Sequence, residues 1–360
     1  MESQTNTIAW MHMLPRPAFC VLDGVIVDAN PAAKGRFIPV GEQVAPLLAT
    51  GQTEYADFSD GLLSLTLRIS DTIYPAAVRR VEGYHVFTLT SENSSAELRA
   101  LDLAAQKLRG PLGAVLAMTD LLFPSLDLPE GSPAAEQAAR INKGLHRMLR
   151  IINNMSDTAR FANEPPRMET RDVNAVLEEL FEHAAYLCEY AGTKLEFTGL
   201  NTQVYSQIDI TLLEKAVYSI LSNALQFPER GGRVDAKLTR RGSTLNLVIQ
   251  DSGTGMDQSV INTIYERYTR EPSLEEEKYG IGLGIKQMEL CASAHGGVLL
   301  LTHTSSGGLR LNMSLRIQVN PELHDRTRRP EFAGGWDCAL VELSDSLPHS
   351  LYQFHKNIDF

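Results

Sequence analysis

The chain has 360 residues, which suits two or three domains that each bury a core of their own. A formal net charge of −11 excludes the global basic field that attracts nucleic acid, and no apolar run approaches the roughly 18 residues of a membrane-spanning helix. The four cysteines lie far apart without CxxC spacing, so we expect a cytoplasmic protein with no disulfide framework, no zinc cluster, no membrane insertion and no nucleic-acid partner.

Residues 1–92 contain short apolar runs separated by Gly, Asp and Asn turns, which predict a small α+β domain. Its opening, PAFCVLDGVIVDANPAA, predicts a strand, a tight turn at Asp23, a second strand and a helix entered through Asn30. This opening resembles the start of PAS sensor domains. Two interpretations stay open: a sensing pocket, or a dimerising spacer without a ligand. The runs that predict strands are FCVLD, GVIVDAN, LLSLTLRIS and YHVFTLT.

Residues 93–165 change to a heptad pattern, which predicts two long helices. A turn over Leu126–Pro133 folds them into an antiparallel hairpin. A hairpin this narrow leaves apolar surface exposed, so we expect two copies to pair into a four-helix bundle and form a homodimer. The alternative is a hairpin that packs on its own neighbouring domains. The apolar stripes consist of Leu101, Ala104, Leu108, Val115, Met118 and Leu122 on the first helix and Ala134, Ala138, Ile141, Leu145, Met148, Ile152, Met155 and Ala159 on the second.

Residues 166–319 alternate between helical and strand patterns, which predicts a third domain with helices on one face of a mixed sheet. Helices are expected over Asp172–Tyr190, over Thr211–Phe227 and up to about Ala294. The expected strands are KLEFTGL, QVYSQI, RVDAKLTRR, TLNLVIQD, VLLLTHT and GLRLNMSLRIQ. Residues 320–360 form a tail in which we read no motif.

Two glycine-bearing segments of the third domain predict a nucleotide site. DSGTGM begins at Asp251 after a strand, and YGIGLGI begins at Tyr279 and opens a helix. Backbone N–H groups and the positive end of the helix dipole favour phosphate at such a helix start. An apolar helix that carries Asn223 precedes both segments. We therefore expect ATP with Mg²⁺ to be the ligand.

With these motifs, residues 96–318 resemble the transmitter core of sensor histidine kinases of two-component signalling, whose ATP domain belongs to the GHKL, or HATPase, superfamily. The resemblance rests on an asparagine helix, DxGxG, a YERY segment, GxGxG and HGG in this order. It implies a multidomain α+β chain: a PAS-like domain, a hairpin that forms a dimeric four-helix bundle, and a GHKL-type α/β sandwich that binds ATP.

The resemblance also implies roles at the adenine and metal end of the site. Asp251 would accept a hydrogen bond from the adenine amine, and Gly253 and Gly255 would let the backbone approach the base. The side-chain oxygen of Asn223 would bind Mg²⁺, and the metal would also bridge phosphate oxygens.

At the phosphate end, the absent side chains of a glycine-rich helix start would leave room for the phosphate chain. The arginines in the segment IYERYTR are candidates for phosphate contacts, and the alternative is that they are simply solvated. Taken singly, each motif residue also has a structural explanation, such as an Asx turn or a helix cap, and only the ordered set favours ATP. The phosphate-end residues are Gly280, Gly282, Leu283 and Gly284, with Arg267 and Arg270 as the arginines.

The hairpin departs from the family pattern at the phosphate-accepting histidine. Aligned on the segment LRGPL, that position holds Gln106, whose amide cannot form a phosphoramidate as an imidazole does. Lys107 replaces the acid that assists proton removal in the family, and Gly110 replaces the polar residue that orients water during dephosphorylation of a partner. Ser219 stands where a second polar amide or acid is common, and Gln226 where a lysine is common, so slow or absent turnover is expected.

Three functional hypotheses follow. The first is a histidine-kinase homologue that binds Mg-ATP without autophosphorylation at residue 106 and acts as a nucleotide-controlled dimeric regulator, with a response regulator or another histidine kinase as its partner. The second is an active protein kinase or ATPase that phosphorylates His146 or a partner protein. We expect His146, beside stripe residue Leu145, to be a solvated or interface residue near the bundle surface. The third is an interaction protein that has lost nucleotide.

Overall fold

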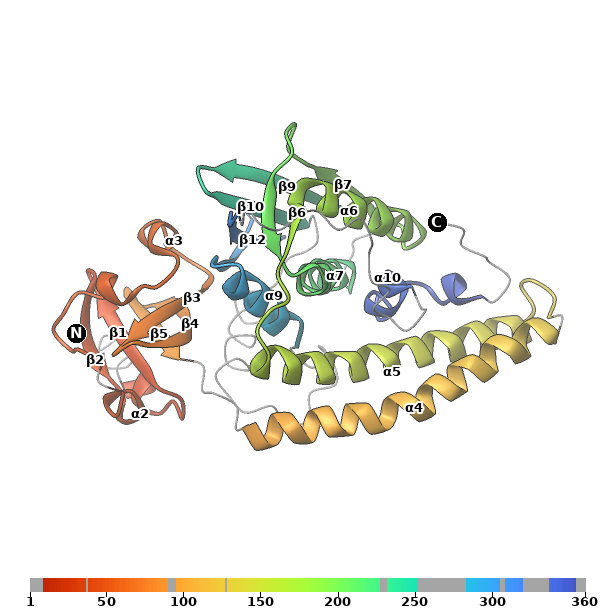
Figure 1. The fold of residues 1–360 in the computed structure, drawn as a ribbon, viewed down its shortest axis with the longest axis horizontal. Helices are drawn as coiled ribbons and strands as arrows, with labels where there is room; N and C mark the ends of the chain where they lie inside the picture. The colour runs from red at the N-terminus through yellow and green to blue at the C-terminus, as the bar shows by residue number, and fades with distance from the viewer. Residues whose placement is uncertain are drawn as a thin grey trace. The chain divides into compact units, whose positions relative to one another are not determined.

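The structure, a computed structural model, describes residues 9–36, 38–89, 95–126, 128–226, 232–251, 283–304, 308–319 and 337–353 (Figure 1). The chain divides into two compact units. Unit 1 comprises residues 1–92 and 237–317, and unit 2 comprises residues 93–236 and 318–360. Both contain helices and strands, which confirms the α+β class. The domain boundaries at residues 92, 165 and 319 stay predictions.

The N-terminal part of unit 1 is an antiparallel sheet with short helices, and its strands follow the order β2-β1-β5-β4-β3. The Asn30 side chain accepts hydrogen bonds from the backbone N–H groups of Ala18 (3.0 Å) and Ala33 (2.9 Å), and so ties β1 to the start of α2. The rings of Phe19 and Phe87 stack in its core, with centroids 4.8 Å apart. The elements are β1 (Ala18–Leu22), β2 (Val25–Ala29), α2 (Pro31–Lys34), η1 (Ala45–Leu47), α3 (Gln52–Ala56), β3 (Leu62–Ile69), β4 (Thr72–Val81) and β5 (Tyr84–Leu89).

The second part of unit 1 continues the same sheet. Strand β3 pairs antiparallel with β11, and Leu63 is the register partner of Leu300. The sheet then runs through β12 and β10 to β9, a strand that begins in unit 2 and ends in unit 1. Val298, next to β11, is buried in the core cluster of the N-terminal part. The elements are β9 (Arg233–Arg241), β10 (Thr244–Asp251), α9 (Leu283–Ala294), β11 (Leu299–His303) and β12 (Leu309–Arg316).

Gly61 allows the close approach of β3 to β11. Its φ is +95°, and a Cβ atom at this position would lie 2.1 Å from the backbone oxygen of Leu301. Such a distance is impossible for a side-chain carbon, so only glycine lets the two strands meet in this register.

Unit 2 contains the two long helices, α4 (Ser95–Ser125) and α5 (Pro133–Asn163), which lie along one another (Figure 1). Pro111 lies inside α4, and the helix continues past it. Ser132 caps α5, because its side chain accepts a hydrogen bond from the backbone N–H of Ala135 at 3.2 Å. The residues buried between the helices are Ala105, Leu112, Leu116, Leu149 and Ile152.

Much of the heptad pattern faces outward instead. The large apolar side chains that are exposed on α4 and α5 are Leu103, Leu108, Val115, Met118, Leu121, Leu122, Ile141, Met148 and Ile151. Several of them belong to the predicted stripes, whereas the residues of the buried seam mostly do not.

In the rest of unit 2, α6, β7, β8 and α7 match the sequence prediction within one or two residues at most element ends, whereas β6 was not predicted. Strand β6 pairs antiparallel with β8, and β7 neighbours β9 in the sheet. Asp172 caps α6, because its Oδ1 accepts from the backbone N–H of Asn174 at 3.2 Å. The elements are β6 (Glu169–Asp172), α6 (Val173–Tyr190), β7 (Lys194–Thr198), β8 (Tyr205–Ile208) and α7 (Ile210–Gln226).

The C-terminal tail also has defined structure. It forms α10 (Cys338–Glu342) and η3 (His349–Tyr352), and it contacts α5, α6 and α7 of unit 2. Among the residues that the structure describes, no helix combines the length and the apolar character needed to cross a membrane.

Candidate functional site

Gln106, at the predicted acceptor position, is an exposed residue of α4. Its Nε2 donates a 2.8 Å hydrogen bond to Oδ2 of Asp102, one helical turn earlier. The other carboxylate oxygen of Asp102 accepts from the Ser156 hydroxyl of α5 at 3.0 Å. Lys107 and Gly110 are exposed as well. The position is therefore open to solvent and presents an amide in place of a nucleophile.

His146, the alternative acceptor, is only 5% exposed. Its Nδ1 lies 2.9 Å from the backbone oxygen of Asn142, and its ring meets the Tyr352 ring edge-on, with centroids 5.1 Å apart. Burial lowers the pKa of His146, although the Asn142 carbonyl and Asp337 act in the opposite direction. The prediction of a solvated histidine is wrong, and the interface alternative holds in a different form, because residues of the C-terminal segment cover this face of α5.

Asn223 lies near the end of α7, the helix predicted to carry it. Ser219, one turn earlier, is 3% exposed and belongs to the packed side of this helix. Ser219 therefore places a buried hydroxyl where related kinases commonly have an amide or an acid, and a hydroxyl is a poor general base.

Asp251 ends β10, as the sequence predicts, and is half-buried. Its Oδ1 accepts a 3.3 Å hydrogen bond from the backbone N–H of Leu309 on β12, which orients the carboxylate. Gly308 permits this arrangement, because a Cβ atom there would lie 2.1 Å from the backbone oxygen of Asp251.

The second glycine segment leads into α9, which begins at Leu283 with Gly284 in its first turn. The predicted residues Gly253, Gly255, Gly280 and Gly282, and the segment 264–270, lie outside the described residues. Asp251 and Gly284 belong to unit 1 and Asn223 to unit 2, and their convergence on one nucleotide stays a prediction.

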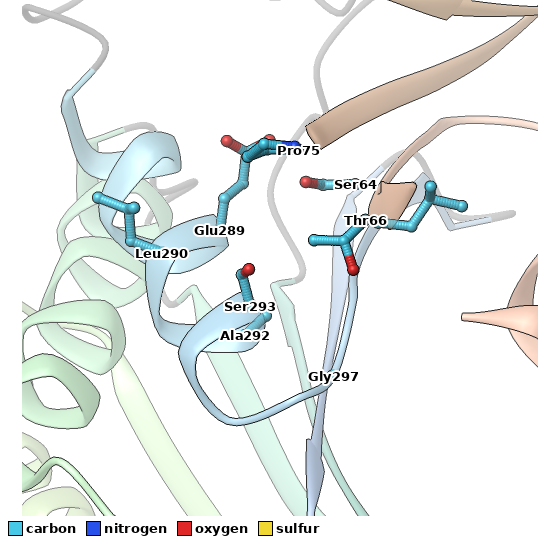
Figure 2. A pocket seen from close by; sticks show the side chains of 9 residues that line it. Ser64, Thr66, Pro75, Glu289, Leu290, Ala292, Ser293 and Gly297 are labelled. Atoms are coloured by element: carbon cyan, nitrogen blue, oxygen red, sulfur yellow. The ribbon is translucent and has the colours of Figure 1, made fainter. Parts of the chain in front are cut away.

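A small cavity in unit 1 is distinct from these residues. Figure 2 shows Glu289 and Ser293 of α9 on one side of it and Ser64 and Thr66 of β3 on the other. Its volume of about 30 Å³ holds one or two water molecules and not a nucleotide.

A charged cluster inside unit 2 was not predicted from the sequence. Lys215 of α7 contacts Asp157 of α5, and its Nζ lies 3.2 Å from Oε1 of Glu342 in α10. Burial acts to lower the pKa of Lys215, but Glu342 and Asp157 outweigh it and raise this pKa above the ordinary lysine value. The only signal in the sequence is a lysine within the apolar helix LLEKAVYSIL.

The chain is similar in sequence to several sensor kinases. Sensor protein KdpD of Escherichia coli K12 is 25% identical over 239 residues, which cover 66% of this chain and 26% of KdpD. Histidine protein kinase DivJ of Caulobacter vibrioides is 24% identical over 227 residues, 62% of this chain and 38% of DivJ. The chain thus spans between a quarter and two fifths of these two relatives.

Among solved structures, full-length ShkA in complex with AMPPNP aligns with this chain at a TM-score of 0.48 and 17% identity, over 62% of this chain and 46% of ShkA. Residues 208–319 match the family model described as the histidine kinase-, DNA gyrase B- and HSP90-like ATPase. This part of the chain is therefore similar to the ATPase domains that this family model describes.

Proposed function

We propose that this protein is a two-component histidine-kinase homologue that binds Mg-ATP, does not phosphorylate itself at residue 106, and acts as a nucleotide-controlled dimeric regulator. The observation that carries the proposal is Gln106, which is exposed on α4 and tied to Asp102. Its amide nitrogen donates its lone pair to the adjacent carbonyl, so it is not a nucleophile at neutral pH. A reachable position without a nucleophile argues for loss of the transfer reaction.

Nucleotide binding is proposed from the ATPase core. The Asp251 carboxylate, oriented by the Leu309 backbone, would accept from the adenine amine. The start of α9, a helix of 12 residues, would place N–H groups and the helix dipole toward phosphate. The amide oxygen of Asn223 would bind Mg²⁺, a metal that prefers oxygen ligands and would neutralise phosphate charge when bound. This donor set fits Mg-ATP.

The structure does not favour His146 as a substitute acceptor. In-line phosphoryl transfer needs a donor phosphorus about 3–3.5 Å from an accepting nitrogen. The His146 ring is packed against Tyr352, and its Nδ1 faces the Asn142 carbonyl. Phosphorylation there would require the C-terminal tail to leave first.

The homodimer is proposed from the surface of the hairpin. Exposed large apolar residues recur at heptad spacing on α4, at Leu108, Val115 and Leu122, and on α5, at Ile141 and Met148, so each helix carries an apolar stripe. Pairing with a second copy would bury that stripe in a four-helix bundle. The PAS-like domain would supply the input, and a response regulator or another histidine kinase would be the partner.

Incubation of the purified protein with γ-labelled ATP and Mg²⁺ tests the proposal, with an active histidine kinase as a positive control. We expect no acid-labile, base-stable label on this protein, although the same preparation binds nucleotide. Such a label would contradict the proposal, and its loss in His146→Ala would identify the acceptor.

A further inference from the structure

Three charged side chains from three separate elements meet inside unit 2. Lys215 (α7), Asp157 (α5) and Glu342 (α10) have side chains that are 8%, 15% and 2% exposed. Removing one member of a buried ion cluster leaves an uncompensated buried charge, which is strongly destabilising. The cluster is therefore stable only when α5, α7 and α10 are all packed together. The C-terminal segment is thus an integral part of the contact between α5 and α7.

A second set of ion pairs fastens the segment to α5. The carboxylate of Asp345 forms an ion pair with Arg150 and a second one with Nε of Arg147, at 2.6 Å. Arg150 also lies 3.7 Å from Glu342. The side chain of Arg150 is 13% exposed, so solvent screens this contact much less than an ordinary surface pair.

Side chains of α5 also satisfy backbone carbonyls of the segment. Nδ2 of Asn142 donates to the Tyr352 oxygen at 3.0 Å, and Nζ of Lys143 donates to the Leu347 oxygen at 2.6 Å. Because these bonds go to the main chain, they fix the path of residues 347–352 along α5. Beneath them, Tyr352 covers the ring of His146.

Apolar packing joins the segment to the core of the hairpin. Val341 is 1% exposed and belongs to the cluster that contains Leu112 and Leu116 of α4 and Leu149 and Ile152 of α5. Without the segment, the apolar surface under Val341 would face water.

The segment reaches the helix predicted to bind nucleotide. The Ser346 hydroxyl donates to the backbone oxygen of Ser222 at 2.9 Å, and the two serine Oγ atoms lie 3.3 Å apart. Ser222 precedes Asn223 in α7. A C-terminal residue therefore contacts α7 directly beside the proposed metal ligand.

We propose that residues 337–353 are an intramolecular clamp, which holds α7 against α5 and releases it when the segment leaves. While the clamp is seated, α7 cannot move relative to the hairpin. A nucleotide that binds α7 better in one of the two states will shift the clamp equilibrium, and clamp occupancy will change nucleotide affinity by the same factor. The clamp does not depend on the proposed function, because the contacts that form it involve no nucleotide.

Hydrogen exchange of the 360-residue chain, followed by mass spectrometry without nucleotide, tests the clamp. Three variants are compared with the wild type: a chain that ends at residue 336, Glu342→Gln, and Glu196→Gln as a matched control. Glu196 pairs with Arg233 on the surface of the same unit, at 2.8 Å, and does not contact the segment. We expect amides of residues 142–157 and 213–222 to exchange about tenfold faster or more in the first two variants, and at the wild-type rate in Glu196→Gln.

Unchanged exchange at both segments in the truncated chain would overturn the clamp. If truncation unfolds the protein, Ser222→Cys combined with Ser346→Cys in a Cys338→Ser background decides the question. The two Oγ atoms are close enough for sulfur atoms there to bond after a small torsional adjustment. We expect oxidation to form the cross-link and to slow exchange in α7 reversibly, with Ser346→Cys alone as the control. Absence of the cross-link would overturn the proposal.

Discussion

The hydroxyl of Ser346 donates a 2.9 Å hydrogen bond to the backbone oxygen of Ser222, a residue that precedes it by 124 positions. This bond links the C-terminal segment to the helix of the proposed Mg²⁺ ligand. Around it, the buried Glu342 near Arg150 and the apolar side chain of Val341 connect the same segment to the hairpin. Residues 337–353, in which the sequence shows no motif, thus contact both the hairpin and α7.

Lys215→Met tests the energetic weight of the buried cluster. The methionine keeps most of the volume but leaves Asp157 and Glu342 as neighbouring buried carboxylates, so we expect the free energy of unfolding to fall by about 3–5 kcal/mol. Urea denaturation measures it. Lys194→Met is the matched control, because Lys194 pairs with Glu196 at 2.5 Å but is 70% exposed. A loss as small in Lys215→Met as in Lys194→Met would contradict the assigned role.

Gly61→Ala tests the pairing of β3 with β11. Gly61 and Gly83 have similar φ values, +95° and +90°, but only the Cβ atom at position 61 would meet a neighbour, Leu301. Both alanines are strained by the positive φ, so the difference between their losses of stability reports the steric clash at position 61 alone. We expect Gly61→Ala to lose about 1–3 kcal/mol more stability than Gly83→Ala. Equal losses in urea denaturation would show that the two strands do not pair in this register.

Acidification should loosen the clamp through His146. Burial lowers the pKa of this ring in the folded protein, so the unfolded chain binds more protons there as the pH falls through the unfolded value of about 6.5. Stability is therefore retained above pH 6.5 and decreases below it. Asp337, the carboxylate that acts on His146, has a pKa held below its ordinary value by His183 against the effect of burial, so it stays ionised in this range.

Unfolding measured at pH 7.5 and pH 5.5 tests this effect in the wild type and in His146→Gln. The pKa of His85 in unit 1 is also lowered by burial, and this second histidine contributes equally to both proteins. We expect a smaller loss of stability on acidification in His146→Gln. The same pH dependence in both proteins would rule out His146 as the source.

Met118→Glu tests the homodimer. Met118 is 69% exposed on α4, and a carboxylate buried there in a four-helix bundle would be desolvated without a partner. We expect the variant to sediment as a monomer at concentrations where the wild type is a dimer. Val319→Glu, at a residue that is 65% exposed outside the hairpin, should stay dimeric. A monomeric wild type, or a dimeric Met118→Glu, would contradict the proposed pairing.

Local patterns were enough to predict most of the elements. The heptads, the apolar alternation and the turn residues depend on near neighbours, so α5, α6, α7 and the strands from β7 to β12 were confirmed. Strand β4 was missed, because Pro75 and the adjacent charges of Arg79 and Arg80 interrupt its pattern. Asp251 was correctly placed at a strand end.

Long-range contacts could not be read from the sequence. The burial of His146 depends on Tyr352, and that of Lys215 on Glu342, and these partners lie more than 100 positions away. No periodicity reports such pairs. The exposure of the heptad stripe could not be predicted for the same reason. A heptad pattern identifies the apolar faces of a helix but does not show which of them packs against the other helix of the hairpin.

Calorimetric titration with Mg-ATP tests the central claim most directly. We expect saturable heat from the 360-residue chain and its loss in Asn223→Ala, together with unchanged stability of that variant. No heat from the wild type, or the same heat from Asn223→Ala, would contradict a nucleotide site built on this helix.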